Sequence, residues 1–143
     1  MKIIRRGSAL WQGGLKDGKG AISTESGALN AYPYGFASRF EGLPGTNPEE
    51  LIAAAHAGCF TMALSLILGN VKLTAEQMET SARVTLEQVD GGYAITAVHL
   101  TLTARIPGAD QATLEKLAGM AKAGCPVSKL LKAEITLDAT LVP

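Results

Sequence analysis

The sequence predicts an α+β fold, because its strands and helices are grouped along the chain rather than alternating regularly. Turn signals and apolar periodicity give strands, one long apolar helix, a hairpin, two shorter helices and a final strand. A length of 143 residues suits one core, so we expect residues 1–143 to form a single domain. A hydrophobic content of 47% excludes a disordered chain.

The charge balance argues against two classes of partner. The 13 basic residues equal the 13 acidic residues, so neither a nucleic-acid surface nor a polybasic membrane patch is expected. Charged residues make up 18%, below the roughly 25% of an ordinary soluble domain, which favours a large apolar subunit interface. No apolar signal segment follows the basic N-terminal residues, so we expect a cytoplasmic protein.

The first forty residues are predicted to be strands joined by glycine turns. Residues 3–11 and 21–25 are extended segments, and 30–35 is expected to be a loop. Apolar and polar residues alternate over 36–41, which predicts a half-buried strand.

A long helix is predicted to begin after Asn47, a good N-cap residue followed by Pro48. Glu49 and Glu50 lie in its first turn, where the helix dipole favours negative charge. Residues 51–68 contain no charged side chain and are long enough to span a membrane. Because polar residues interrupt this segment, we expect a helix packed in protein and not a membrane span. The helix is apolar nearly all round, so we expect it to be buried on most of its sides.

The second half predicts a hairpin, two helices and a strand. The expected elements are a strand over 80–89, a turn at Asp90-Gly91-Gly92, a strand over 93–106, a helix over 110–121 capped by Asp110, a short helix from Pro126 to about Leu131, and a strand over 134–141.

Cys59, in the middle of the long helix, has two interpretations. It is either a small buried hydrophobe or a thiol at the bottom of a pocket, where Gly58 leaves room for a ligand. His56 lies three residues earlier on nearly the same face, so it could pair with Cys59 or be a core histidine bonded to a carbonyl. His56 and His99 are the only histidines, and no carboxylate cluster joins them, so no metal-ligand spacing appears.

Cys125 precedes Pro126 at the predicted start of the short helix, where exposed backbone N–H groups favour a thiolate. The alternative is an unreactive N-cap residue. The two cysteines, 66 positions apart, form a redox pair only if the fold brings them together. Taken alone, Arg39 and Glu49 are an ordinary surface arginine and first-turn glutamate.

Three segments, 47–52, 55–60 and 122–128, resemble the signature segments of the OsmC/Ohr family. This is the family of osmotically inducible proteins and organic hydroperoxide resistance proteins, and the similarity extends over essentially the whole chain. The resemblance implies an intertwined α+β homodimer, with long central helices wrapped by antiparallel sheets.

The resemblance also implies a thiol peroxidase that reduces organic hydroperoxides and, more weakly, hydrogen peroxide. Cys59 matches the peroxidatic cysteine and Cys125 the resolving cysteine, while Arg39 and Glu49 match the arginine and glutamate of the site. No cofactor or metal is implied, and an external dithiol, typically of lipoyl type, resets the disulfide. Burial raises the pKa of a cysteine, so the arginine would supply the cation that a thiolate needs.

Helix geometry adds an expectation about assembly. Glu49 and Cys59 are ten residues apart, so about 15 Å along the helix axis and roughly 80° around it. One arginine would reach both from the same helix only under strain. Two such helices packed across a two-fold axis would bring Glu49 of one chain near Cys59 of the other. We therefore expect an obligate homodimer with two active sites at its interface.

Two other functions fit parts of the sequence. One is a non-catalytic, stress-induced protein that holds a small ligand in an apolar pocket of the same fold. The other is a Cys–His hydrolase or transferase that uses Cys59 and His56, for which His56→Ala would abolish activity and Cys125→Ser would be harmless. The peroxidase predicts nearly the reverse.

Overall fold

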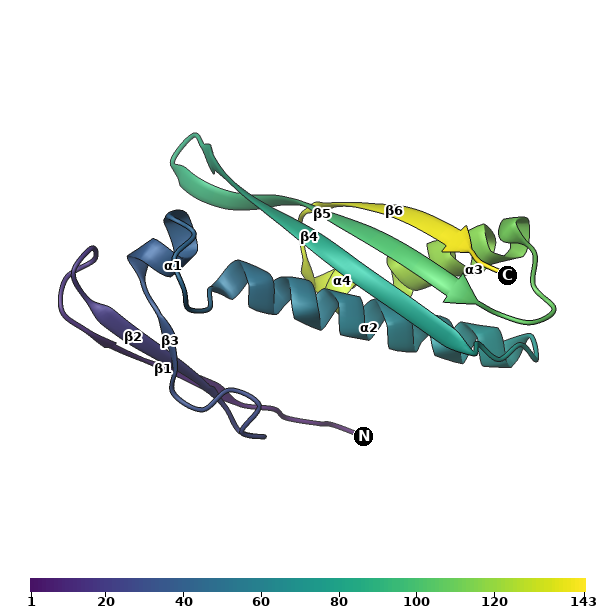
Figure 1. The fold of residues 1–143 in the computed structure, drawn as a ribbon, viewed down its shortest axis with the longest axis horizontal. Helices are drawn as coiled ribbons and strands as arrows, with labels where there is room; N and C mark the ends of the chain where they lie inside the picture. The colour runs from purple at the N-terminus through teal and green to yellow at the C-terminus, as the bar shows by residue number, and fades with distance from the viewer. The chain divides into compact units, whose positions relative to one another are not determined.

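The computed structural model describes residues 1–143, which form two compact units, 1–51 and 52–143. Figure 1 shows the helices and strands of both units, coloured along the chain. The elements are segregated as the sequence predicts, which confirms the α+β class.

The first unit contains a three-stranded antiparallel sheet in the order β1-β2-β3. Its strands are β1 (Gly7–Gln12), β2 (Lys19–Thr24) and β3 (Tyr32–Tyr34). The prediction of a loop over 30–35 is wrong for the central residues, because Tyr32–Tyr34 pairs with β2 as an edge strand. Pro33 lacks a backbone N–H, and an edge strand is where a sheet tolerates that loss.

The alternation over residues 36–41 predicted a strand, and this prediction is wrong. The segment forms the short helix α1 (Phe36–Phe40). Phe36 and Phe40 share a face in either geometry, since four residues are two strand periods and about one helical turn. In the helix the two rings lie 5.0 Å apart between centroids. The Ser38 hydroxyl accepts a hydrogen bond from the Gly35 N–H, which satisfies a free donor at the helix start.

The long helix α2 (Pro48–Asn70) confirms the predicted helix and its start directly after Asn47. The Asn47 side chain accepts a hydrogen bond from the Glu50 N–H at 2.8 Å, as expected of an N-cap. By length and hydropathy alone, α2 is also long and apolar enough to cross a membrane.

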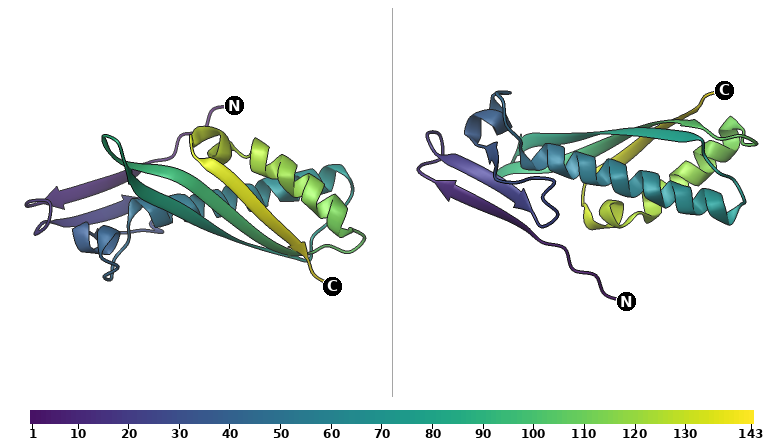
Figure 2. Two further views of the ribbon diagram at one scale, coloured as in Figure 1. Left: turned by 90° about the horizontal axis from the view of Figure 1, so that it is seen from above. Right: turned by 60° about the horizontal axis from the view of Figure 1, so that its bottom comes forward.

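In the second unit, β4 (Gln77–Val89) and β5 (Gly92–Arg105) form an antiparallel hairpin. The chain turns at Gly91 and Gly92, which have φ values of 91° and 140° that favour glycine. Strand β6 (Glu134–Leu141) pairs with β5 in parallel, after a crossover that contains α3 (Gln111–Gly124) and α4 (Pro126–Leu130). Figure 2 shows this connection from two sides.

The core of the second unit lies between its sheet and helices. It is formed by apolar side chains of α2, β5 and α3, all of them almost completely buried: Phe60, Leu64, Leu68, Val98, Leu100, Leu102, Ala104, Leu114, Leu117, Ala118 and Ala121. The cluster continues to Cys125, so the second cysteine is part of this core.

Only one face of α2 is buried in the chain, which corrects the expectation of burial on most sides. His56, Phe60, Leu64 and Leu68, spaced four residues apart, face the core. Met62 and Leu66 on other faces are 76% and 69% exposed. An apolar helix needs cover on more than one side, and a single chain supplies it on one side only.

Candidate functional site: a buried thiol pair

The two cysteines lie together in the second unit, and both are free thiols. Cys59 comes from the middle of α2, and its thiol lies close enough to the Cys125 thiol for Cys125 to raise its pKa. Cys125 is completely buried at the junction of α3 and α4. The fold therefore meets the condition that a redox pair requires.

The start of α4 shapes the surroundings of both sulfur atoms. Pro126 occupies the first turn, and Cys125 is the N-cap residue, whose Sγ accepts a hydrogen bond from the Ser128 N–H at 3.4 Å. The neighbouring Val127 N–H donates to the Cys59 thiol. Two consecutive backbone amides are thus directed at the two sulfurs.

Burial raises the pKa of the Cys59 thiol above its ordinary value. The Val127 N–H acts in the opposite direction, because it stabilises the thiolate, while the neighbouring Cys125 raises the pKa further. Within the second unit, the surroundings of Cys59 therefore favour the thiol, and a thiolate there needs an additional cation.

Sequence reasoning missed Ser128, which connects His56 to the thiol pair. The Ser128 Oγ lies 2.7 Å from His56 Nε2 and 3.1 Å from Cys125 Sγ. The partner of His56 is thus a hydroxyl and not the carbonyl expected for a core histidine. Burial lowers the pKa of His56, so the imidazole is neutral near pH 7. The spacing Cys125-x-x-Ser128 at a helix start was the available signal, since residue N3 of a helix faces the N-cap.

Arg39 and Glu49 form a pair of their own in the first unit. The Arg39 Nη2 donates to Glu49 Oε1 at 2.6 Å, and its Nε donates to both carboxylate oxygens at 3.1 and 3.2 Å. The Glu49 side chain is only 12% exposed and that of Arg39 37%. The guanidinium is therefore held by the carboxylate while part of it still faces solvent.

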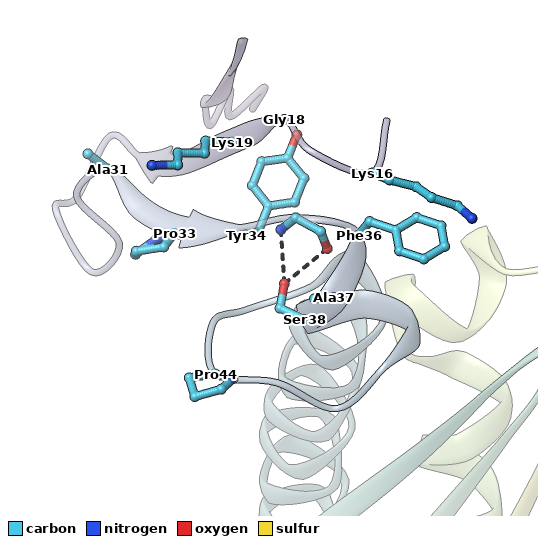
Figure 3. A pocket seen from close by; sticks show the side chains of 12 residues that line it. Lys16, Gly18, Lys19, Ala31, Pro33, Tyr34, Phe36, Ala37, Ser38 and Pro44 are labelled. Carbon is cyan, nitrogen blue, oxygen red and sulfur yellow. Dashed lines mark hydrogen bonds between the residues drawn. The ribbon is translucent and has the colours of Figure 1, made fainter. Parts of the chain in front are cut away.

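A polar network joins the two short segments that carry this ion pair. The Ser38 hydroxyl donates to the Thr46 carbonyl at 2.8 Å, and the Asn47 amide donates to the Ser38 carbonyl at 3.3 Å. The Thr46 hydroxyl donates to the Glu50 carboxylate at 2.6 Å. Figure 3 shows the Ser38 side chain hydrogen-bonded to the backbone where α1 begins. These contacts fix α1, and so Arg39, against the first turn of α2.

The family model for OsmC-like proteins matches residues 40–140. The chain belongs to the OsmC-like protein family. It is 56% identical over 141 residues to the peroxiredoxin OsmC of Escherichia coli, covering 99% of each chain. It is 34% identical over 101 residues to an organic hydroperoxide resistance protein of Xanthomonas axonopodis, covering 70% of this chain and 69% of that protein.

A solved structure supports the OsmC-like fold. The organic hydroperoxide resistance protein OhrB of Bacillus subtilis superposes with a TM-score of 0.68 at 26% sequence identity. The match covers 96% of this chain and 98% of that protein. The family and the OsmC-like α+β fold of the single chain, both expected from the sequence, are therefore confirmed.

In this OsmC-like chain, the four candidate residues fall into two pairs. Cys59 and Cys125 meet in the second unit, and Arg39 and Glu49 meet in the first. An open apolar cavity of about 520 Å³ lies beside Gly58, whose absent side chain leaves free space, but Cys59 does not line it. No group of three or more His, Cys, Asp and Glu side chains is placed to hold a metal ion.

Proposed function

We propose that this chain is a thiol peroxidase that reduces organic hydroperoxides and, more weakly, hydrogen peroxide, with Cys59 as the peroxidatic cysteine and Cys125 as the resolving one. The closeness of the partly buried Cys59 thiol to the buried Cys125 thiol carries the proposal. The names of the relatives support the substrate class, since they are a peroxiredoxin and an organic hydroperoxide resistance protein.

In the first step, the Cys59 thiolate attacks one peroxide oxygen. A sulfur–oxygen bond forms, the oxygen–oxygen bond breaks, and the sulfur loses two electrons to the peroxide. The alkoxide leaves and takes a proton to become an alcohol, and Cys59 becomes a sulfenic acid. Arg39 stabilises the thiolate and the charge on the leaving oxygen, and Glu49 orients the guanidinium fork.

In the second step, Cys125 attacks the sulfenic sulfur, so that a disulfide forms and water leaves. No resident cofactor takes part. An external dithiol then reduces the disulfide by thiol–disulfide exchange, and we propose a reductant of the lipoyl type in the cytoplasm.

We further propose that the two units work as one OsmC-like domain over residues 1–143 within a homodimer. The exposed apolar face of α2, with Met62 and Leu66, favours a packed second copy. Glu49 lies in the first turn of α2 and Cys59 ten residues later, about 15 Å along the axis. Sites completed across the two-fold axis bring the Arg39–Glu49 pair of one chain to the thiols of the other.

The decisive experiment is a single-turnover reaction of the reduced protein with one equivalent of tert-butyl hydroperoxide. Intact mass should fall by two hydrogens, and peptide mapping should locate one disulfide between Cys59 and Cys125. Cys59→Ser should not react, and Cys125→Ser should gain one oxygen and stop there. A protein that binds the hydroperoxide without any change in mass would be a ligand carrier and not a peroxidase.

The reductant is tested separately, on disulfide-containing protein. Dihydrolipoamide should restore two free thiols faster than a matched concentration of reduced thioredoxin. Equal or better reduction by thioredoxin would overturn the assignment of the reductant and leave that of the cysteines intact.

A further inference from the structure

His56, Ser128 and Cys125 form a continuous hydrogen-bonded chain, and the two steps above use only its last member, Cys125. Its members come from α2 and α4, 72 positions apart, and His56 is completely buried. The distances are 2.7 Å from His56 Nε2 to Ser128 Oγ and 3.1 Å from Ser128 Oγ to Cys125 Sγ. The serine hydroxyl is therefore the single link between the imidazole and the second sulfur.

Packing alone accounts poorly for this histidine. Its Nδ1 is buried and has no hydrogen-bond partner. A buried polar atom without a partner costs stability, and a side chain present only for packing would not incur this cost. The other ring nitrogen nevertheless has a short contact to Ser128, which points to a use for the imidazole itself.

We infer that Ser128 and His56 form a relay that removes the proton from Cys125 as Cys125 attacks the oxidised Cys59. The inference rests on the proposed function and deepens its second step. Ser128 touches the reacting sulfur, and His56 acts through Ser128 as a positioning residue.

The donors and acceptors in this chain of hydrogen bonds can be arranged in two ways. In the resting state the Cys125 S–H donates to Ser128 Oγ, and the Ser128 hydroxyl donates to neutral His56 Nε2. During the attack both protons shift by one place, so that the thiolate accepts from the hydroxyl and the hydroxyl accepts from an imidazolium. Burial lowers the pKa of His56, so the resting ring is neutral and Nε2 has a free lone pair. The same burial disfavours the imidazolium, which therefore passes its proton on to the leaving hydroxide.

The step balances in atoms and electrons. The Cys125 sulfur forms a bond to the Cys59 sulfur, and the sulfur–oxygen bond of the sulfenic acid breaks. Cys125 is oxidised by one electron equivalent, and Cys59 is reduced by one. The hydroxide that leaves is neutralised by the proton held on the imidazole, and the net products are the disulfide and one water.

The test separates the two steps in time. Reduced protein is mixed with one equivalent of tert-butyl hydroperoxide, quenched at intervals and analysed by intact mass. The gain of one oxygen reports the first step, and the later loss of water reports the second. In Ser128→Ala and His56→Gln, the first step should match wild type, and the second should be about 100-fold slower.

Two further variants keep the test specific. Ser128→Thr retains the hydroxyl and should restore a second step close to the wild-type rate. His99→Gln is the matched control, because His99 also contacts a hydroxyl, that of Thr136, but on the sheet. It should leave both steps unchanged.

The relay is overturned if Ser128→Ala and His56→Gln form the disulfide as fast as wild type. It is also overturned if both variants slow the two steps equally, since the residues then merely support the fold of the pocket. Failure of the wild-type protein to gain oxygen or form the disulfide would instead refute the proposed function, and the relay with it.

Discussion

Arg39 holds both carboxylate oxygens of Glu49, with its shortest hydrogen bond at 2.6 Å. The two side chains project from α1 and from the first turn of α2, ten positions apart. A planar guanidinium bound in this way has one orientation, and its remaining donors are free to face a substrate. The pair is thus a rigid cation, while each residue alone would be a mobile surface charge.

This geometry predicts that a positive charge alone at position 39 is insufficient for rapid oxidation of Cys59. Arg39→Lys keeps the charge but loses the fork, and we expect the rate of Cys59 oxidation by tert-butyl hydroperoxide to fall about 100-fold. Glu49→Gln should also slow this step, because an amide offers only one acceptor oxygen. The measurement is the second-order rate of hydroperoxide consumption. Arg83→Lys, at an exposed position of β4, is the matched control and should have no effect.

Two variants of Asn47 should distinguish its capping of α2 from its hydrogen bond to Ser38 in α1. Asn47→Ala removes the acceptor for the Glu50 N–H, so the free energy of unfolding should fall by about 1 kcal/mol in urea titration. Asn47→Asp keeps a capping oxygen and should restore most of that stability, although it loses the amide donor to Ser38. If Asn47→Ala unfolds at the wild-type urea concentration, the Thr46–Glu50 hydrogen bond is sufficient to hold the helix start.

The buried His56 predicts a loss of stability in acid. Burial lowers its pKa in the folded protein, while the unfolded chain titrates near the ordinary value of 6.5. Below that pH the unfolded state binds the proton more readily, so the free energy of unfolding falls by up to about 1.4 kcal/mol per pH unit. Above pH 6.5 His56 is neutral in both the folded and the unfolded chain, so its titration no longer lowers the free energy of unfolding. His56→Gln should have a flatter profile below pH 6.5, and an unchanged slope would show that other groups cause the acid sensitivity.

The exposed face of α2 predicts how the protein assembles. Met62→Glu places a charge in the proposed interface, and burial of an unpaired charge is costly. We expect this variant to sediment as a monomer and to lose peroxidase activity. Met120→Glu makes the same change at a position of α3 that is 51% exposed and should remain dimeric. A Met62→Glu protein that stays dimeric would place the subunit interface elsewhere.

Local chemistry made much of the fold predictable. Asn47, Asp110 and Cys125 each precede a helix and each cap it, because an N-cap bonds only to residues two or three positions away. The turn at Gly91 and Gly92 was predictable for the same reason. The helix α1 was not, since the spacing of Phe36 and Phe40 suits a strand equally well.

The candidate site was predictable only in part. The family resemblance supplied Cys59, Cys125, Arg39 and Glu49, and the structure adds which of them touch. The spacing from Cys125 could have indicated Ser128, but its contact with His56 could not be predicted, because it joins segments 72 positions apart. The one-sided burial of α2 was also beyond the sequence, since an apolar helix has the same pattern whether its own chain or another covers it.

The thiol contact between α2 and α4 has a consequence for the resistance of the protein to heat. A disulfide there would tie together positions 66 residues apart and restrict the unfolded chain, which corresponds to about 4 kcal/mol. Calorimetry should find a higher melting temperature after oxidation, and a lower one would mean that closing the bond strains the helices. In the proposed cycle, the oxidised protein that waits for its reductant would thus be the most durable form of the chain.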